Sequence, residues 1–170
     1  MNKEEIEQLI QLYEHNLLQY AFRLLGSDDY VADAVQEAFI GYCRARAQKK
    51  RIDNPQAWLY GAVRNKCIDF LRKHQRKISL EVTEQYSQQN SSHNNSPDKT
   101  MITIENLDII KSCFDDLSVR EREVVSLKLE QQKSYKEIAQ ILEISSSNVG
   151  FIMHTAMKKL RKNVAMRGEQ

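Results

Sequence analysis

One stretch of the chain cannot contribute to a folded core, and it divides the rest into two parts. Residues 83–100 contain no aliphatic side chain, and Tyr86 is their only aromatic residue. Gln, Ser and Asn predominate, so this stretch cannot bury enough apolar surface to offset the loss of chain entropy on folding. We therefore predict a flexible linker at residues 78–103, between one folded unit at 1–77 and another at 104–166.

The first part has the periodicity of three amphipathic helices. Apolar residues recur at three- and four-residue intervals over residues 3–25, and Gly26 is a natural helix end. Ser27, followed by two aspartates, is expected to cap a second helix that runs to about residue 47. Asn54 and Pro55 place a capping residue before a proline, which predicts the start of a third helix. The second helix should turn inward Val31, Ala34, Val35, Ala38, Phe39 and Tyr42.

The second part contains two helix starts of the same kind. Ser118 with Glu121, and Ser134 with Glu137, have the spacing of a capping box. A tight turn at residues 143–145 predicts a last helix that begins near Ser145 or Ser146. The chain has only five glycines and two prolines, which favours long helices over a turn-rich β architecture. The predicted fold class is therefore all-α, with two small helical domains joined by a flexible linker.

Residues that support catalysis, metal binding or membrane insertion are absent or scattered in the sequence. Cys43, Cys67 and Cys113 have no CxxC spacing and no histidine beside them, which indicates buried, reduced thiols and no metal site. No glycine-rich phosphate loop or nucleophile motif occurs, so we expect no enzymatic activity and no cofactor. No apolar run approaches the roughly 20 residues that cross a bilayer. Because residues 1–7 are also unlike a signal peptide, we expect a cytoplasmic protein without membrane insertion.

Charge within the first unit is strongly divided along the chain. Residues 1–40 carry eight acidic and two basic side chains, whereas residues 41–77 carry eleven basic and two acidic ones. The net charge of +2 for the whole chain conceals this division. A unit with one acidic and one basic part is typical of a protein that binds two different partners.

The second unit contains the spacing of a helix-turn-helix motif at residues 134–160. Ile138 and Ala139 lie on the expected buried face of a short helix, and a three-residue turn follows. Val149, Ile152, Met153 and Ala156 give the last helix a face that packs across the first one. In such motifs the second helix enters the major groove of DNA. The alternative is a helical hairpin that only packs.

These motifs together resemble the extracytoplasmic-function (ECF) sigma factors of RNA polymerase. Residues 117–162 are similar to region 4 of that family, which contacts the −35 promoter element. Residues 31–45 (VADAVQEAFIGYCRA) resemble the polymerase-binding helix of region 2, and residues 54–77 resemble the helix after it, which contacts the −10 element. The resemblance implies a factor that binds core RNA polymerase and directs promoter recognition, DNA melting and transcription initiation.

The family's mode of polymerase binding points to three residues. In ECF sigma factors an acidic helix face docks on a cationic coiled coil of the β′ subunit, and region 4 lies near the β flap. The matching positions here are Asp33, Gln36 and Glu37, which share one face of the second helix. Carboxylates on such a face suit a partner that presents arginines. The alternative is a solvated face without a partner.

The resemblance also implies a −10 reader in the basic part of the first unit. In the family, the loop after the second helix captures an unstacked base, and the third helix holds the non-template strand. Because unpaired bases are bound, this contact favours melted promoter DNA over duplex. The basic and polar residues that match are Arg44, Arg46, Lys49, Lys50, Arg51, Arg64, Asn65, Lys66, Arg72 and Lys73.

The presumed recognition helix departs from the family pattern because residues 146–157 contain no charged side chain. Gly150 and Phe151 stand where cationic or small polar residues are common. The candidate −35 contacts are Lys136, Ser146, Ser147, Asn148, His154 and Lys158. Without arginines the electrostatic part of DNA affinity is small. Our hypothesis is weak or relaxed −35 recognition, and the alternative is that Ser and Asn suffice once polymerase adds its affinity.

Partners other than polymerase and promoter DNA stay open at this stage. An anti-sigma factor, or an accessory DNA-bound protein that recruits the factor, is compatible with the sequence. The rival interpretations are a stand-alone helix-turn-helix regulator, and an adaptor that uses Phe151, Ile152 and Met153 as an apolar anchor.

The length of the predicted linker bears on DNA binding. Fully extended, residues 78–103 would span roughly 80 Å, but relaxed they would span about 25–30 Å. Polymerase must therefore hold this segment stretched for the two units to reach both promoter elements. For this reason we expect the free factor to bind duplex DNA poorly and the holoenzyme to bind it well.

The uncharged recognition helix generates a prediction for promoter dependence. Scrambling the −10 element should abolish transcription by the holoenzyme, whereas scrambling the −35 element should leave measurable transcription, because few charge-assisted contacts are lost there. Runoff transcription from the two scrambled templates measures the difference. Equal abolition of transcription by the two scrambles would show that the hypothesis of weak −35 recognition is wrong.

Overall fold

The structure is a computed structural model, and it describes residues 3–26, 30–84, 114 and 116–167. All elements of this part of the chain are helical, which confirms the predicted all-α class. The first unit contains α1 (Lys3–Leu25), α2 (Val31–Ala47) and α3 (Pro55–Glu84). The second contains α5 (Val119–Val125), the π-helical turn η1 (Ser126–Glu130), α6 (Tyr135–Leu142) and α7 (Ser146–Arg167). None of the helices described combines the length and apolar character that a membrane crossing requires.

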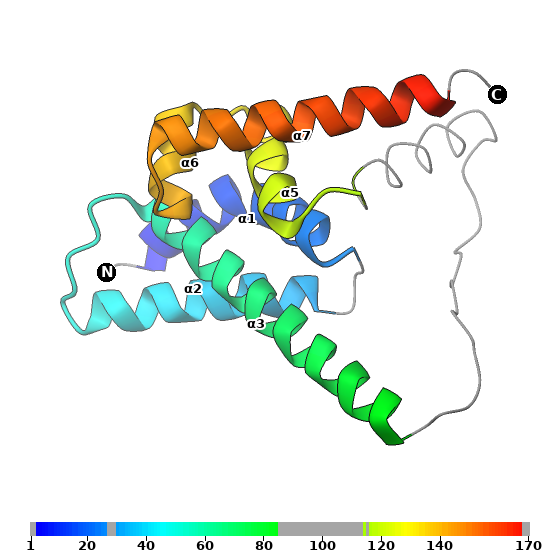
Figure 1. The fold of residues 1–170 in the computed structure, drawn as a ribbon. Coiled ribbons are helices and arrows are strands. Elements are labelled where there is room, and N and C mark those ends of the chain that lie inside the picture. Colours follow the sequence, from blue (N-terminus) through cyan, green and yellow to red (C-terminus); the bar gives the residue numbers. More distant parts are fainter. Residues whose placement is uncertain (1–2, 27–29, 85–113, 115, 168–170) are drawn as a thin grey trace, which may run out of the picture.

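The first unit is a bundle in which α1, α2 and α3 contact one another (Figure 1). Gly26 ends α1 with a positive φ of 71°, a conformation that glycine adopts without strain. The six residues predicted to face inward from α2 are all buried. Asn54 Oδ1 accepts a hydrogen bond from the amide of Ala57 at 3.0 Å, so the predicted cap of α3 is present.

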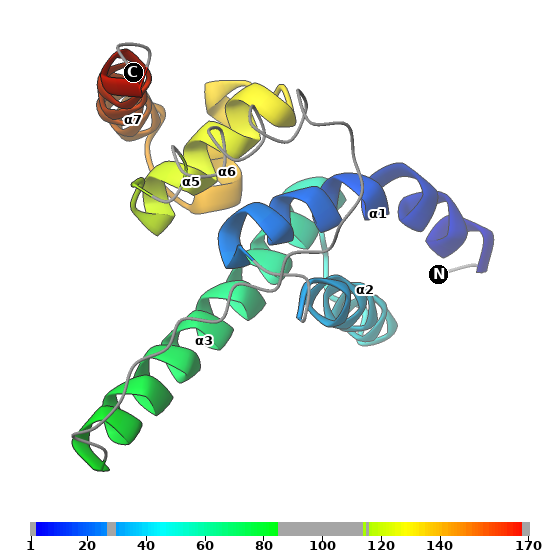
Figure 2. The same cartoon turned by 90° about the vertical axis from the view of Figure 1, so that its right-hand side faces the viewer.

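One predicted helix boundary lies outside the described residues, and another helix is longer than expected. Ser27 and the aspartates after it lie outside the described residues, and α2 begins at Val31 without a side-chain cap from Tyr30. The helix α3 continues to Glu84, past residue 77, where the first unit was expected to end. Figure 2 shows this last part of α3 projecting beyond the other helices. The remainder of the predicted linker lies outside the described residues.

Both capping boxes predicted for the second unit are formed. Ser118 and Glu121 exchange bonds at the start of α5, and Ser134 and Glu137 do so at the start of α6. Ser145 then accepts a hydrogen bond from the amide of Asn148 at 3.2 Å and caps α7. Local sequence therefore determines where each of these helices starts.

The two units pack against each other and share one apolar core. Contacts join α1 to α5 and to η1, and α3 to α6. Leu24, Tyr60 and Val63 of the first unit belong to the same buried cluster as Val125 and Leu127 of the second. In Figures 1 and 2, α1 lies between α2 and the helices of the second unit. We call this contact between the two units the closed arrangement.

A bridge between α5 and α7 generates a prediction for stability. Lys159 Nζ lies 2.8 Å from Oε2 of the buried Glu121. Burial raises the pKa of Glu121, but the hydrogen bonds from Lys159 and Ser118 outweigh it, so the pKa falls below the usual value of 4.5. Lys159→Met should lower the free energy of unfolding by about 1 kcal/mol at neutral pH.

The pH dependence of this effect follows from the lowered pKa. A carboxylate with a depressed pKa stabilises the fold above the pKa of the unfolded chain, and this stabilisation is lost as pH falls through the folded pKa. The difference between Lys159→Met and the unaltered protein should therefore shrink below pH 4.5. Urea denaturation at several pH values measures it, with the exposed Lys162→Met as the matched control. A difference that persists unchanged at low pH would contradict the assignment.

Candidate polymerase and nucleic-acid interfaces

The residues predicted to bind polymerase lie together on the outer face of α2. Asp33, Gln36 and Glu37 are all exposed, on the side opposite to the buried residues of this helix. Glu37 forms an ion pair with Lys66 of α3, and each of the two side chains is about half exposed. The hydrogen bond that Lys66 donates to Glu37 raises the pKa of Lys66 despite some desolvation. This ion pair joins a predicted polymerase residue to a predicted DNA residue.

An apolar groove lies beside this face, and the sequence had not indicated it. The groove has a volume of about 610 Å³ and runs between α1 and α2. Its walls are mainly aliphatic and aromatic side chains such as Ile10, Leu18 and Phe39, whereas Gln36 and Arg44 supply polar groups. Ile40, on the same wall, is 42% exposed. The predicted polymerase face therefore combines acidic side chains with accessible apolar surface.

Most of the predicted −10 residues are exposed, whereas Arg64 and Lys66 are partly buried. Arg44, Arg46, Lys49 and Lys50 are exposed at the end of α2 and in the loop after it, as are Arg72 and Lys73 on α3. Arg51 is also exposed, although its Nε lies 2.6 Å from Asp53 Oδ1. The exposed group is therefore accessible to a nucleic-acid backbone.

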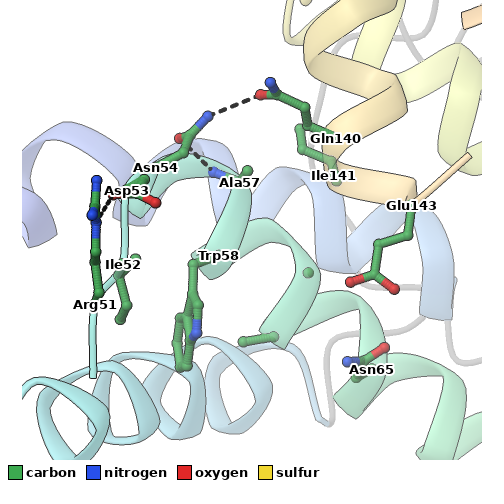
Figure 3. Close-up of a pocket in the computed structure, with 12 residues that line it drawn as sticks. Arg51, Ile52, Asp53, Asn54, Ala57, Trp58, Asn65, Gln140, Ile141 and Glu143 are labelled. Carbon is green, nitrogen blue, oxygen red and sulfur yellow. Dashed lines mark hydrogen bonds and ion pairs between the residues drawn. The ribbon is translucent and has the colours of Figure 1, made fainter. Parts of the chain in front are cut away.

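Two of the exposed −10 residues, Arg51 and Asn65, border a cavity between the two units. The cavity has a volume of about 440 Å³, and Figure 3 shows residues 51–54, Trp58 and Asn65 on one side of it. The other side is formed by Gln140, Ile141 and Glu143 of the second unit. Asn54 Nδ2 donates a hydrogen bond of 3.1 Å to Gln140 Oε1 across the cavity mouth (Figure 3). A hydrogen bond therefore joins the loop expected to capture an unpaired base to α6, although the loop residues stay exposed apart from the partly buried Ile52.

Arg64, a predicted −10 residue on α3, is engaged by the second unit. Its Nε lies 2.6 Å from Oε1 of Glu123, a side chain with no exposed surface. Arg120 approaches the other oxygen of Glu123 at 3.1 Å. Burial raises the pKa of Glu123, and the two guanidinium groups only partly oppose this effect. Arg64 is therefore not available to DNA in the closed arrangement.

Further polar contacts between the units surround this ion pair. Tyr60 donates its hydroxyl to Gln131 Oε1 at 3.1 Å, and Gln131 Nε2 donates to Gln19 Oε1 at 3.2 Å. Arg23 Nη2 lies 2.6 Å from Glu130 Oε1. Ser126 donates its hydroxyl to the other oxygen of Glu130 at 2.7 Å. The turn η1 supplies Ser126 and Glu130, so a π-helical turn, a feature often found at functional sites, forms part of this contact.

The helix-turn-helix predicted for the second unit is present. The helices α6 and α7 pack together, and between them Glu143 adopts a left-handed conformation with φ of 53°. All the predicted −35 residues are exposed, namely Lys136, Ser146, Ser147, Asn148, His154 and Lys158. Phe151 is 70% exposed, whereas Met153 is buried and Ile152 is partly buried. Of the three residues suggested as an apolar anchor, only Phe151 therefore lies on the surface.

Several residues of the contact between the units were missed by sequence analysis. Glu123, Glu130 and Gln131 had no predicted role, because their partners lie in a distant part of the chain. A glutamate beside Val124 and Val125 in an amphipathic pattern could have indicated a buried charge, but nothing in the sequence identifies Arg64 as its partner. In the described part of the chain, no group of three or more acidic, His or Cys side chains could hold a metal ion.

Comparison with known proteins agrees with this arrangement of sites. The family model for Sigma-70 region 2 matches residues 9–77, and that for Sigma-70 region 4 matches residues 107–160. The ECF RNA polymerase sigma factor SigX of Bacillus subtilis is 26% identical over 170 residues, which cover 99% of this chain and 88% of SigX.

Two solved structures share the fold of nearly the whole chain. RpoE of Bartonella quintana, in complex with the anti-sigma factor NepR, has a TM-score of 0.73 at 20% identity, with 95% of this chain and 98% of RpoE covered. CnrH, in complex with the cytosolic domain of CnrY, has a TM-score of 0.69 at 21% identity, with 97% of this chain and 90% of CnrH covered.

The presence of regions 2 and 4 in this order defines a class, the promoter-recognition factors of bacterial RNA polymerase. The chain belongs to the ECF sigma factors. It partners with core RNA polymerase and promoter DNA and directs transcription initiation, which confirms the function inferred from the sequence. The family assignment also decides against the stand-alone regulator and the adaptor.

Proposed function

We propose that three surfaces of this sigma factor divide the work of initiation. Asp33, Gln36 and Glu37 of α2 bind the β′ coiled coil, and the adjoining groove supplies apolar area to the same contact. The loop after α2 and the basic side of α3 bind the melted −10 strand. The helix α7 contacts the −35 element while region 4 lies near the β flap. The exposure of each surface supports this division, as does the separation of acidic from basic residues.

The closed arrangement is, in this proposal, the form of the factor without polymerase. The observation that carries it is the ion pair between Arg64 and Glu123, because it places a −10 residue in contact with region 4. Asn54, although exposed, also bonds to α6, and both units line the cavity beside it. Binding of polymerase must therefore separate the two units before Arg64 can contact DNA. This requirement explains the poor duplex binding expected of the free factor.

The partners and location proposed for this chain follow from the same division. An anti-sigma factor would act by holding the closed arrangement, and the two similar solved structures are complexes in which RpoE binds NepR and CnrH binds CnrY. An accessory DNA-bound protein is a second way to supplement a weak −35 contact. The factor works on the polymerase in the cytoplasm, needs no cofactor and catalyses no reaction itself, since RNA synthesis belongs to the polymerase.

The acidic face of α2 is tested by charge reversal. The double variant Asp33→Lys/Glu37→Lys should weaken assembly with core RNA polymerase at least tenfold, because two carboxylates that face a cationic partner become repulsive. A pull-down or fluorescence titration with purified core measures the affinity. The control Asp69→Lys/Asp116→Lys makes the same change in charge away from α2 and should assemble normally. Unchanged assembly of Asp33→Lys/Glu37→Lys would refute the proposed docking site.

The closed arrangement is tested through Arg23 and Glu130, which are not among the proposed DNA or polymerase contacts. Arg23→Glu and Glu130→Arg should each weaken the contact between the units by about 1 to 2 kcal/mol, or roughly 5- to 30-fold. Small-angle X-ray scattering should then show a larger radius of gyration for either single variant. The double variant Arg23→Glu/Glu130→Arg restores an opposite pair and should return to the compact value.

The same variants connect closure to DNA binding. Both single variants should bind a promoter fragment more strongly than the unaltered free factor in a gel shift, although they change the net charge in opposite directions. A general change in electrostatic attraction would raise DNA affinity in one variant and lower it in the other. A gain in both variants therefore reports opening of the units. If neither single variant expands, or if the double variant stays expanded, the closed arrangement does not limit access to DNA.

A further inference from the structure

The outer face of α7 presents an aromatic side chain where a DNA-binding helix faces the major groove. Ser147, Phe151, His154 and Lys158 follow one another at four- and three-residue intervals and are all exposed. They therefore form one stripe along the helix, called the outer stripe below. The opposite face, with Val149, Met153 and Ala156, is buried against the rest of region 4. Among the large apolar side chains of the described residues, Phe151 is the most exposed, at 70%.

A second exposed aromatic residue lies next to the outer stripe. Tyr135 is 40% exposed, and its ring approaches α7 at Gly150, where a Cβ atom would lie 3.6 Å from Tyr135 Cε2. Lys128 Nζ lies 5.4 Å from the centre of the Tyr135 ring. The exposed surface near Gly150 therefore includes two aromatic side chains, Tyr135 and Phe151, with a cation beside Tyr135.

The charges around this surface favour DNA as its occupant over an apolar protein surface. Residues 144–162 contain no acidic side chain, so no carboxylate on α7 would repel phosphates. Lys136, Lys158, Arg161 and Lys162 are exposed on the same motif. Such cations can contact the backbone on either side of the groove while the outer stripe faces the base edges.

The major groove offers one apolar group to such a side chain. The 5-methyl group of thymine projects into it, whereas the other base edges present hydrogen-bond donors and acceptors. A phenylalanine cannot donate or accept a hydrogen bond at a base edge, but it can bury a methyl group. Its placement between Ser147 and His154 lets polar contacts form on both sides of the apolar one.

We propose that Phe151 recognises the 5-methyl group of a thymine in the −35 element. The proposal rests on the proposed contact of region 4 with this element and adds a specificity-determining residue to it. Recognition then depends on apolar contact rather than on arginines, and the weak electrostatic component of α7 is compensated in part by a buried methyl group.

The first experiment identifies the preferred bases with the intact holoenzyme. A pool of promoters with a randomised −35 window and a fixed −10 element is selected for binding by core polymerase with the full-length factor. The unaltered factor should enrich thymine at one or two positions, on either strand. Phe151→Ala should lose this enrichment. Leu129→Ala, which removes another exposed apolar side chain of region 4, should keep it.

The second experiment isolates the methyl group. Each enriched thymine is replaced by deoxyuridine, which keeps every hydrogen-bonding group and lacks only the methyl. Affinity of the holoenzyme should fall about fourfold at the contacted position, as expected for one methyl group returned to water. Phe151→Ala should bind the thymine and deoxyuridine promoters equally, and Phe151→Leu should retain part of the preference.

The possible outcomes separate this proposal from the one on which it rests. If scrambling the window lowers affinity but no deoxyuridine does, region 4 contacts the −35 element and Phe151 does not recognise a methyl group. If scrambling has no effect at all, the −35 contact itself is wrong and the methyl proposal fails with it. Equal loss of activity by Phe151→Ala on thymine and deoxyuridine templates, without any thymine preference in the unaltered factor, would assign Phe151 to a protein partner.

Discussion

The contact between Arg64 and Glu123 is the interaction around which the two units of this protein are arranged. A carboxylate without exposed surface must be compensated, and the compensation comes from Arg64 of region 2 and Arg120 of region 4. Burial nevertheless raises the pKa of Glu123, so desolvation outweighs the two guanidinium groups. Buried ion pairs of this kind contribute little net stability but specify one arrangement, because a displaced partner would leave a buried charge. The ion pair therefore specifies how the units fit, whereas the apolar core that they share supplies stability.

The contact between the two units combines this ion pair with apolar and neutral polar contacts. The apolar core continues from region 2 into region 4, and Tyr60, Gln131 and Gln19 extend it with neutral hydrogen bonds. In the closed arrangement Arg64 is paired with Glu123 of region 4, and Asn54 bonds to Gln140. The acidic residues of α2, in contrast, have no ion pair with the described residues of region 4 and stay exposed. In the proposed function polymerase therefore engages the factor first, and Arg64 is released afterwards.

Elements determined by local sequence were predicted well. The capping boxes at Ser118 and Ser134, and the cap at Asn54, were visible because both partners lie within three residues of each other. The buried side of α2 followed from helical period. The continuation of α3 to Glu84 was not predicted, because Ile78, Leu80 and Val82 alternate with polar residues instead of following helical period. The cap expected at Ser27 lies outside the described residues.

The sequence by itself determined the helices, their inward faces, the separation of acidic from basic charge and the helix-turn-helix. These features depend on neighbours within a turn or two of the chain, where spacing alone decides which side chains meet. Only the tertiary structure decided that Glu123 pairs with Arg64 and that Gln140 bonds to Asn54. Such pairings depend on how two preformed surfaces fit together. The residues involved are far apart in sequence, so no periodicity records their proximity.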